Sequence, residues 1–554
     1  MLNSAMRALL WEEFKAWSAL AGPVALSRFS ELLPWLVQLI IVGHVGVREL
    51  AALSLMETWL YPFMICLWTA VGTALSTLVS QAHGSRRLGV ARGWGVLALG
   101  ATAAGSVLAT GAWLAGKPVL DALGFDPALT TLAQSYTLWA LPALWLEGFN
   151  IVVGTYLEAC QIVLPPLALA LLACGVDIAV CVLLVFGWPA VYSGMQDKLA
   201  GLGIGWSCAA LTSTLGSLLL LWLYTGRELE FGHEERDGEE EEQQQGREGK
   251  ALALAEGGEG LVSAAHALNS SSLEEGSTPL LGKPSTPPAG SSSPSLDLPA
   301  LLAFFTSCRR WRSFGGQALP ALATSVLSNT QFTVISLLAA TLGPTALATH
   351  NTVLCLFEVV ATAGAGMTEA TATRVGFHVG RGDAPAAQRT ALVALAAGTA
   401  WGAACAAAGI PLRHAMGQLF TSDPGVLALT AQIAPWMWGG YAVLSAGDIA
   451  LGVMAGVGAA REESAVFLLG VWGVGLPLAV ASLRCTQWGL QGLWAALVAG
   501  YLVLDVLAFV VVWRMDWEKV VLEARERAAE EEEEGGGEEE EEERGGEGRV
   551  EGEG

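Results

Sequence analysis

Eight ionisable side chains lie inside long apolar stretches of this sequence, where each would be costly to bury. They are Arg28, Glu31, Glu57, Glu147, Asp177, Glu358, Glu369 and Asp448. An ionisable group in an apolar environment is expensive unless it pairs with another group or binds a ligand. A carboxyl group in such an environment can also take up and release a proton near neutral pH. These residues are therefore the candidates for binding ions or cationic ligands.

Two of these groups are three residues apart near the beginning of the chain. At this spacing Arg28 and Glu31 share one helical face, where they can pair or where Glu31 can bind a cation. Gln38 continues the same face, and Pro34 between them is expected to kink the helix. This face is a candidate binding surface with Glu31 and Gln38 as its polar groups.

Two glutamates occupy one stripe of a later helix. Glu358 and Glu369 are eleven residues apart, which is about three helical turns. Glu358 lies deep in its apolar stretch and is a candidate site for a coupling ion. Glu369 lies near the end of that stretch, and we expect it to pair with Arg374.

Asp448 lies among small residues, with Ser445 three positions before it and Tyr441 seven before. An acid beside an aromatic ring suits an organic cation, through charge and cation-π attraction. A polar side chain in a membrane can equally serve as an interhelical hydrogen bond. Both interpretations of Asp448 stay open at this point.

The composition places these residues in a membrane protein. Of the 554 residues, 53% are hydrophobic and 15% charged. Such a chain is expected to be polytopic, with apolar runs of about 20 residues that each cross a bilayer. The formal net charge of -23 comes largely from two tracts, residues 226–313 and Glu530–Gly554. Both are rich in Glu and Gly, the first also in Ser and Pro, and we expect them to be disordered and solvated.

Several function classes find no support in the motifs. The nine cysteines form no CxxC or Cys/His spacing, and no GxxxxGK[ST] nucleotide-binding motif occurs. We therefore expect no enzyme, no ATP-driven pump, no cofactor, no metal site and no nucleic-acid partner. A monomer in the lipid bilayer is expected.

Twelve membrane helices are predicted, six on each side of residues 226–313. The predicted spans are Ala16–Val42, Leu50–Ser80, Trp94–Leu114, Leu132–Val153, Ile162–Phe186, Ala200–Tyr224, Leu319–Leu342, Thr345–Thr373, Thr390–Ile410, Leu427–Met454, Ser464–Leu483 and Leu490–Trp513. The fold class is thus an all-α polytopic membrane protein. Its predicted domains are a bundle in 1–225, a linker in 226–313, a second bundle in 314–513 and an acidic tail in 514–554.

The basic residues predict the orientation in the membrane. Arginines cluster in loops on one side, and such loops are usually cytoplasmic. The clustered residues are Arg86, Arg87, Arg92, Arg309, Arg310, Arg312, Arg374, Arg381 and Arg389. Both termini and the linker are therefore expected in the cytoplasm. The plasma membrane and a vacuole-like organelle membrane are both open as locations.

The two halves look like repeats of one unit. Residues 126 and 423 (both Asp before Pro), 139 and 436 (both Trp) and 46 and 343 (both Gly) are each 297 positions apart. Since each half holds an even number of helices, both begin on the same side of the membrane. The halves are then related by an axis along the membrane normal, and substrate is expected between them.

The order of several short motifs resembles the multidrug and toxic compound extrusion (MATE) family, in particular its eukaryotic branch. The motifs are GHVGVRELAALSL (43–55), SQAHGS (80–85), YLEACQIVLPP (156–166), LGPTALATHNTV (342–353), TATRVGFHVGRGD (371–383), GVMAGVG (452–458), GLP (475–477) and GLQGLW (489–494). The resemblance implies two pseudo-symmetric six-helix bundles around a central cavity. It also implies alternating access and export of organic compounds in exchange for protons or sodium.

This chain lacks acidic residues at several positions where the resemblance to the family leads us to expect them. Ser328 stands where eukaryotic members have a functional Glu in helix 7, and Leu444 stands where a Glu is common in helix 10. Gln38 aligns with the bacterial Asp of helix 1. Asp177 stands where the family has an Asn or Asp in helix 5, so it is the best-aligned acid.

Three functions are carried forward. The leading one is a secondary antiporter that exports organic cations, drugs or metabolites in exchange for protons or sodium, with Glu31, Gln38, Asp177, Glu358 and Asp448 as candidate ion-coupling or substrate-binding residues. The alternative within transport is efflux of an organic anion such as citrate, for which Arg28 is the available basic group. From another class, the chain could be a membrane scaffold or sensor that does not transport.

Overall fold

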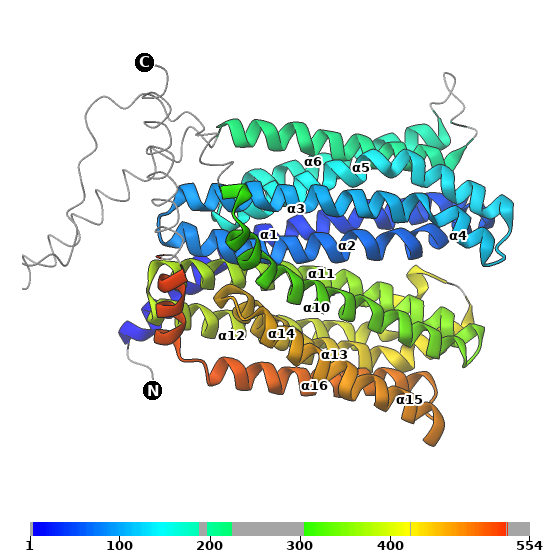
Figure 1. The fold of residues 1–554 in the computed structure, drawn as a ribbon. Coiled ribbons are helices and arrows are strands. Elements are labelled where there is room, and N and C mark those ends of the chain that lie inside the picture. Colours follow the sequence, from blue (N-terminus) through cyan, green and yellow to red (C-terminus); the bar gives the residue numbers. More distant parts are fainter. Residues whose placement is uncertain are drawn as a thin grey trace, which may run out of the picture. The chain divides into compact units, whose positions relative to one another are not determined.

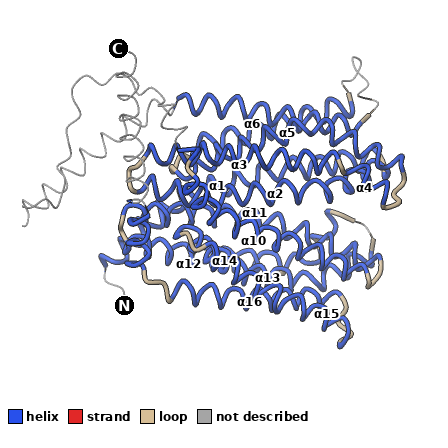
Figure 2. Tube along the Cα trace, viewed as in Figure 1, coloured by secondary structure: helices blue, strands red, loops and turns tan. Residues whose placement is uncertain are grey.

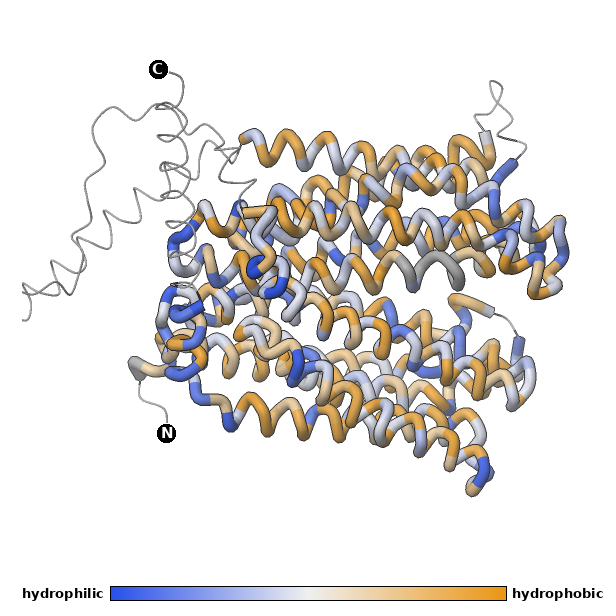
Figure 3. The backbone as a smooth tube through the Cα atoms, viewed as in Figure 1, coloured by the Kyte–Doolittle hydropathy of each residue, from blue (hydrophilic) through white to orange (hydrophobic). Residues whose placement is uncertain are grey.

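The structure, a computed structural model, describes residues 4–187, 195, 197–223, 304–421, 423–527 and 529 (Figure 1). These residues are almost entirely helical and include no strand (Figure 2). In the described part of the chain, twelve helices are long and apolar enough to cross a membrane. Hydrophobic residues dominate along them, and hydrophilic residues gather at their ends (Figure 3). The predicted all-α class and the twelve spans are confirmed.

The first half contains six of these spans and one short helix. Its helices are α1 (Ser4–Val45), α2 (Val47–Gly84), α3 (Leu88–Leu114), the short α4 (Gly116–Ala122), α5 (Pro127–Ala159), α6 (Leu164–Phe186) and the helix Lys198–Leu223.

The second half repeats this order with one interrupted helix. Its elements are α10 (Cys308–Ala340), α11 (Pro344–Arg381), α12 (Ala384–Gly409), the 3-10 turns η1 (Pro411–His414) and η2 (Met416–Leu419), α13 (Pro424–Val457), α14 (Ala460–Phe467), the π-helix η3 (Leu468–Gly475), α15 (Leu476–Cys485) and α16 (Leu490–Trp513). The α14, η3 and α15 segments form one continuous span, Ala460–Cys485. A further helix covers residues 517–527.

Two helices begin more than ten residues earlier than predicted. α1 begins at Ser4 rather than Ala16, and a 2.7 Å pair between Lys15 and Glu12 supports its added turns. α10 begins at Cys308, within the range predicted as linker, because the Ser307 hydroxyl caps the helix by accepting from the Arg310 N–H. The predicted linker up to residue 303, and the predicted tail beyond residue 529, lie outside the described residues.

The landmarks of the repeat mark where helices start and stop. Asp126 caps α5 and Asp423 caps α13, each with a proline at the first helical position. Gln161 and Gly458, also 297 positions apart, both adopt left-handed backbone conformations just after these helices end. A left-handed residue after a helix satisfies its last carbonyl groups. The repeat therefore preserves the signals that fix helix boundaries.

The two halves belong to one compact unit, Met1–Ser217 with Pro299–Gly554, and hydrogen bonds join them at one end of the bundle. We call this end the base; α1 begins there, and α2 joins α3 and α11 joins α12 there (Figure 1). Ser76 on α2 and Thr373 on α11 lie 3.4 Å apart through their hydroxyl groups. These two residues are equivalent in the repeat, so the pseudo-twofold axis passes between them.

Further contacts close the base. The Thr77 hydroxyl donates to the Ala455 carbonyl at 2.8 Å, and the Gln81 amide donates to the Gly456 carbonyl at 3.0 Å. The Trp17 indole of α1 donates to the Thr371 hydroxyl at 3.0 Å. Trp17 also belongs to a buried cluster with Ala370, Ala394 and Ile449. The beginning of α1 is thus packed into the second half of the molecule.

Glycine allows α2 and α11 to approach so closely. A side chain at Gly380 would collide with the backbone of Gln81. We expect Gly380→Ala to lower the free energy of unfolding by about 1–3 kcal/mol, because the two helices must move apart. Thermal unfolding of the purified protein measures this effect. Gly439→Ala is the matched control, because open space surrounds Gly439. An equal loss of stability in both variants would contradict the close packing at the base.

Candidate functional site

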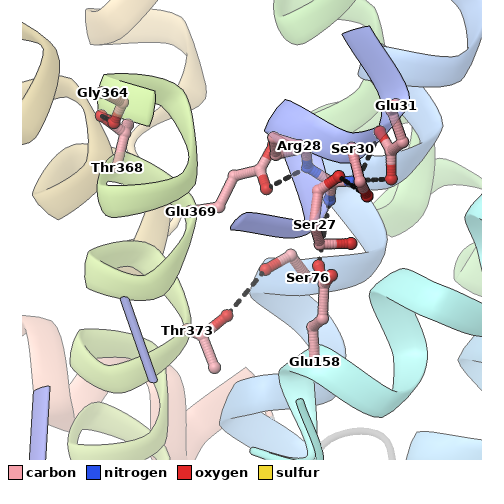
Figure 4. Close-up of polar contacts among 10 residues, drawn as sticks. All are labelled: Ser27, Arg28, Ser30, Glu31, Ser76, Glu158, Gly364, Thr368, Glu369 and Thr373. Carbon is pink, nitrogen blue, oxygen red and sulfur yellow. Dashed lines mark hydrogen bonds and ion pairs between the residues drawn. The ribbon is translucent and has the colours of Figure 1, made fainter. Parts of the chain in front are cut away.

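Arg28 forms the centre of an ionic cluster between the halves (Figure 4). Its Nε donates to Oε2 of Glu369 on α11 at 2.7 Å. Its Nη2 donates to Oε2 of Glu158 on α5 at 3.0 Å, and its Nη1 to Oε1 of Glu31 at 3.0 Å. The cluster therefore ties α1 and α5 of the first half to α11 of the second.

The charges of this cluster do not balance. One guanidinium faces three carboxyl groups, which leaves a net charge of −2 when all three are ionised. The Arg28 side chain is 22% exposed and that of Glu158 only 10%. Removing one partner of a buried ion pair leaves an uncompensated charge, which is strongly destabilising. Among the described residues, Arg28 is the cation that pairs with all three acids.

The structure corrects the predicted partner of Glu369. Glu369 pairs with Arg28 and not with Arg374, so that prediction is wrong. Arg374 instead donates from Nη2 to Oε2 of Glu13 at 3.0 Å, and Glu13 also accepts from the Thr390 hydroxyl at 2.6 Å. Glu13 lies in the part of α1 that the sequence interpretation left outside the membrane helix. The pairs of Arg28 with Glu369 and of Arg374 with Glu13 therefore link α1 to α11.

The predicted residues Gln38 and Asp177 lie together in the first half. The Gln38 amide donates to both carboxylate oxygens of Asp177, at 3.2 and 3.0 Å. The Cys181 thiol donates to Asp177 Oδ1 at 3.1 Å. Both Gln38 and Asp177 are buried. These neutral donors can hold the carboxylate while leaving its charge available to a proton or cation.

A second acid of the first half lies near this pair. Glu147 on α5 interacts electrostatically with Glu31 and Asp177. Asn150 donates to Glu147 at 3.4 Å and accepts from the Thr214 hydroxyl at 3.1 Å. The first half therefore gathers several acids along α1, α5 and α6. Glu31 is the most exposed of them, and its close partner is Arg28.

The second half has a group of acids around the half-buried Asp448. Asp448 has no hydrogen-bond or ion-pair partner among the described residues. It interacts electrostatically with Glu463 on α14 and with Tyr501 and Asp505 on α16. Asp505 is 5% exposed, and its Oδ1 packs against Gly447, where a side chain would collide with it. We call Asp448, Glu463, Tyr501 and Asp505 the second-half acidic cluster.

Several polar atoms around this cluster are buried without a hydrogen-bond partner in the described part of the chain. They are Oε2 of Glu463, the Tyr501 hydroxyl, Oδ1 of Asp505 and Oε1 of Gln331 on α10. A buried polar atom without a partner costs about 1–3 kcal/mol, so each calls for a bound proton, ion or water. The described His, Cys, Asp and Glu side chains nowhere form a group of three that could hold a metal ion.

Tyr441 occupies different surroundings from those expected, and Glu358 lies partly exposed on α11. Glu358 is half-buried on α11 and interacts electrostatically with Tyr501. Tyr441 is fully buried; its hydroxyl donates to the Val360 carbonyl at 2.8 Å and accepts from the Trp401 indole at 2.9 Å. The ring of Tyr441 is therefore packed within the bundle rather than open to a ligand beside Asp448.

The sequence did not lead us to three polar residues that lie in or beside the second-half acidic cluster. Asp505 lies in the apolar stretch of α16, four residues after Tyr501, and the rule that selected Asp448 would have selected it too. Glu463 stands among charged residues and looked like part of a loop, although α14 begins at Ala460. Gln331 carries no charge, so no rule for ionisable residues could have found it.

Comparison with known proteins agrees with this architecture. The sequence profile of the MatE family matches residues 23–183 and again residues 320–481. The two matches begin 297 positions apart, which is the offset of the repeat. Two copies of one family unit therefore account for the two halves.

Individual relatives are similar over most of the chain. Multidrug and toxin extrusion protein 1 from Xenopus tropicalis is 24% identical over 94% of this chain and 77% of its own length. The human protein of the same name is 24% identical over 93% of this chain and 77% of its own length. A probable multidrug resistance protein NorM from Xanthomonas axonopodis is 32% identical over 36% of this chain and 44% of its own length.

Solved structures share the fold. The crystal structure of the eukaryotic MATE transporter AtDTX14 has a TM-score of 0.70 at 18% identity, covering 94% of this chain and 99% of its own. A MATE structure in complex with MaD3S has a TM-score of 0.71 at 16% identity, covering 93% of this chain and 97% of its own. Since the family profile covers more than half of the sequence as two repeats, the chain belongs to the MatE family of multidrug and toxin extrusion transporters.

Proposed function

We propose that this protein is a secondary antiporter that exports organic cations, drugs or metabolites in exchange for protons or sodium. The observation that carries the proposal is Asp448, a carboxyl group inside the second half with no hydrogen-bond or ion-pair partner among the described residues. Asp177 supplies a buried acid in the first half. The names of the relatives, multidrug and toxin extrusion proteins, support the substrate class.

Competition for one carboxylate would couple the flux of the substrate to the flux of the proton or sodium ion. A cavity acid binds either the coupling ion or the cationic substrate, and either one neutralises its charge. A bare charge in a low-dielectric environment resists enclosure, so the halves would rock only when the acid is occupied. Asp177, Asp448 and Glu358 are the acids to which we assign this role, with Gln38 positioning Asp177. We place Glu31 in the ionic cluster of Arg28 instead.

The base would face the cytoplasm. The arginines at the α2–α3 and α11–α12 turns and at the start of α10 lie at this end of the bundle, and cytoplasmic loops carry an excess of basic residues. The contacts between α1, α2 and α11 would then close the cytoplasmic side. Alternating access requires these contacts to break in the other state.

Export of an organic anion has less support. An anion would need a basic group open to it, and Arg28 was the residue that could supply one. Its guanidinium donates to Glu31, Glu158 and Glu369. This engagement favours a cationic substrate over citrate-like anions.

Gradient-driven uptake tests the proposal. The full chain is reconstituted into proteoliposomes, and uptake of a fluorescent organic cation is measured under an imposed pH gradient and then under a sodium gradient. Uptake is expected under at least one gradient and should fall in Asp177→Asn and Glu358→Gln. The absence of driven uptake under both gradients, with folded protein, would refute antiport of cations.

A further inference from the structure

A basic cavity opens at the base between both halves and the helix of residues 517–527. Its volume is about 280 Å³. The first half contributes Gln81, Ser85 and Arg87, and α11 contributes Gly380. The 517–527 helix contributes Arg525 and Arg527. This cavity plays no part in the transport mechanism proposed above.

The lining of the cavity selects for anions. Three arginines reach it, and the described residues that line it include no Asp or Glu. A hydrogen bond from Arg525 Nη2 to the Gly382 carbonyl, 3.4 Å long, positions the Arg525 side chain. Gly382 has a left-handed backbone conformation, and a side chain at this position would collide with the Arg525 guanidinium. Guanidinium groups match carboxylates in geometry and can bind them through two parallel hydrogen bonds. A ligand with several carboxylates would therefore fit this cavity.

The chain itself supplies such a ligand three residues after Arg527. Glu530–Glu534 and Glu538–Glu543 place eleven glutamates within fourteen residues. An extended chain covers about 3.3–3.6 Å per residue, so a few residues suffice to reach a cavity that Arg527 itself lines. A short flexible tether also gives an effective concentration in the roughly millimolar range.

We propose that this cavity is the docking site of the acidic stretch Glu530–Glu543 of the same chain. Charge complementarity and the short tether favour this stretch over the acidic run in the linker, Glu239–Glu242, which has only four consecutive glutamates. The headgroup of an anionic lipid is the competing occupant, and the experiment below separates the two.

Docking would act on both halves at once. Gln81 and Arg87 belong to the first half, whereas Gly380 and the 517–527 helix belong to the second. An acidic segment held there would contact both halves.

Zero-length cross-linking tests the docking without any transport assay. A carbodiimide joins a lysine amine to a nearby carboxylate as an amide, with loss of water, and does not react with arginine in this way. Arg87→Lys therefore places a reactive amine in the cavity, 443 positions before Glu530. In the full chain in neutral-lipid nanodiscs, mass spectrometry is expected to find amides between position 87 and Glu530–Glu543. Their yield should fall severalfold at high salt, since screening weakens exposed charge pairs.

Matched variants keep the test specific. Arg484→Lys places the same amine on an exposed residue of α15 at the opposite end of the bundle, where no product with the acidic stretch is expected. Adding Arg525→Gln and Arg527→Gln to Arg87→Lys should reduce the product severalfold. The pair of Lys519 and Glu523, 3.4 Å apart, is the internal reference for reactivity.

Three results would overturn the proposal. One is the absence of the product at position 87 while the reference amide forms. Another is a yield that does not change when Arg525 and Arg527 are replaced. The third is loss of the product when phosphatidylserine replaces the neutral lipid, which would make a lipid headgroup the occupant; persistence of the product in that lipid supports the acidic stretch.

Discussion

Replacing Arg28 by alanine is expected to loosen the base and to reduce gradient-driven transport roughly tenfold or more, since conformational couplings of about 1–3 kcal/mol change populations about 5- to 150-fold. The substitution removes the cation that Glu31, Glu158 and Glu369 share. The three carboxyl groups would then repel one another across the two halves. Because Arg28 and Glu369 are partly exposed, removing the Arg28 side chain is expected to cost less free energy than breaking a fully buried ion pair.

The packing of the base can be followed directly in this variant. Ser76→Cys combined with Thr373→Cys places two thiols at the contact between equivalent residues of the repeat, where the native hydroxyls are 3.4 Å apart. The yield of the disulfide, read by mass spectrometry, is expected to fall when Arg28→Ala is added. Arg48→Ala is the matched control, because Arg48 pairs with Asp126 at 3.5 Å and both side chains are more than half exposed. Equal effects of the two alanine substitutions would contradict an ionic lock centred on Arg28.

Asp448→Asn is expected to abolish gradient-driven uptake while leaving exchange of labelled for unlabelled substrate measurable. Asparagine keeps the shape of the side chain but cannot bind a proton or carry the charge that a cation neutralises. The expected loss is roughly a hundredfold, since mutational removal of a proton-transfer group costs about 10²–10⁴ in rate. Uptake under a pH gradient and under a sodium gradient, with substrate exchange measured on the same preparation, gives the result.

The same helix offers a control for this variant. Asp423 caps α13 by accepting from the Val426 N–H at 2.9 Å, and asparagine caps helices equally well. Asp423→Asn is therefore expected to transport like the parent. Gradient-driven uptake that survives in Asp448→Asn would remove Asp448 from the coupling mechanism, and Asp505 and Glu463 would be tested next.

Much of the fold could be predicted from the sequence because its signals are local. Runs of apolar residues fix the twelve spans, and capping pairs such as Asp126 with Pro127 fix where helices begin. The 297-residue repeat could be read from the same capping residues. The boundaries that failed, at Ser4 and Cys308, are places where polar residues continue a helix beyond its apolar stretch.

The candidate site was harder to predict because its contacts join distant parts of the chain. Spacing along one helix identified the pair of Arg28 and Glu31, but it assigned Glu369 to the nearby Arg374. The structure pairs Glu369 with Arg28, 341 positions away, because α1 packs into the second half. Gln38 and Asp177 were selected separately, and their hydrogen bond depends on the packing of α1 on α6.

The most direct test of the account is the coupled movement of two ions in one preparation. Proteoliposomes with no preset gradient contain a trapped pH dye or a trapped sodium dye, and a quaternary ammonium ion is added outside. With antiport, entry of the organic cation is expected to drive protons or sodium out of the liposomes, and Asp448→Asn is expected to stop this outward movement. Entry of the organic cation with no counter-movement of either ion would contradict antiport.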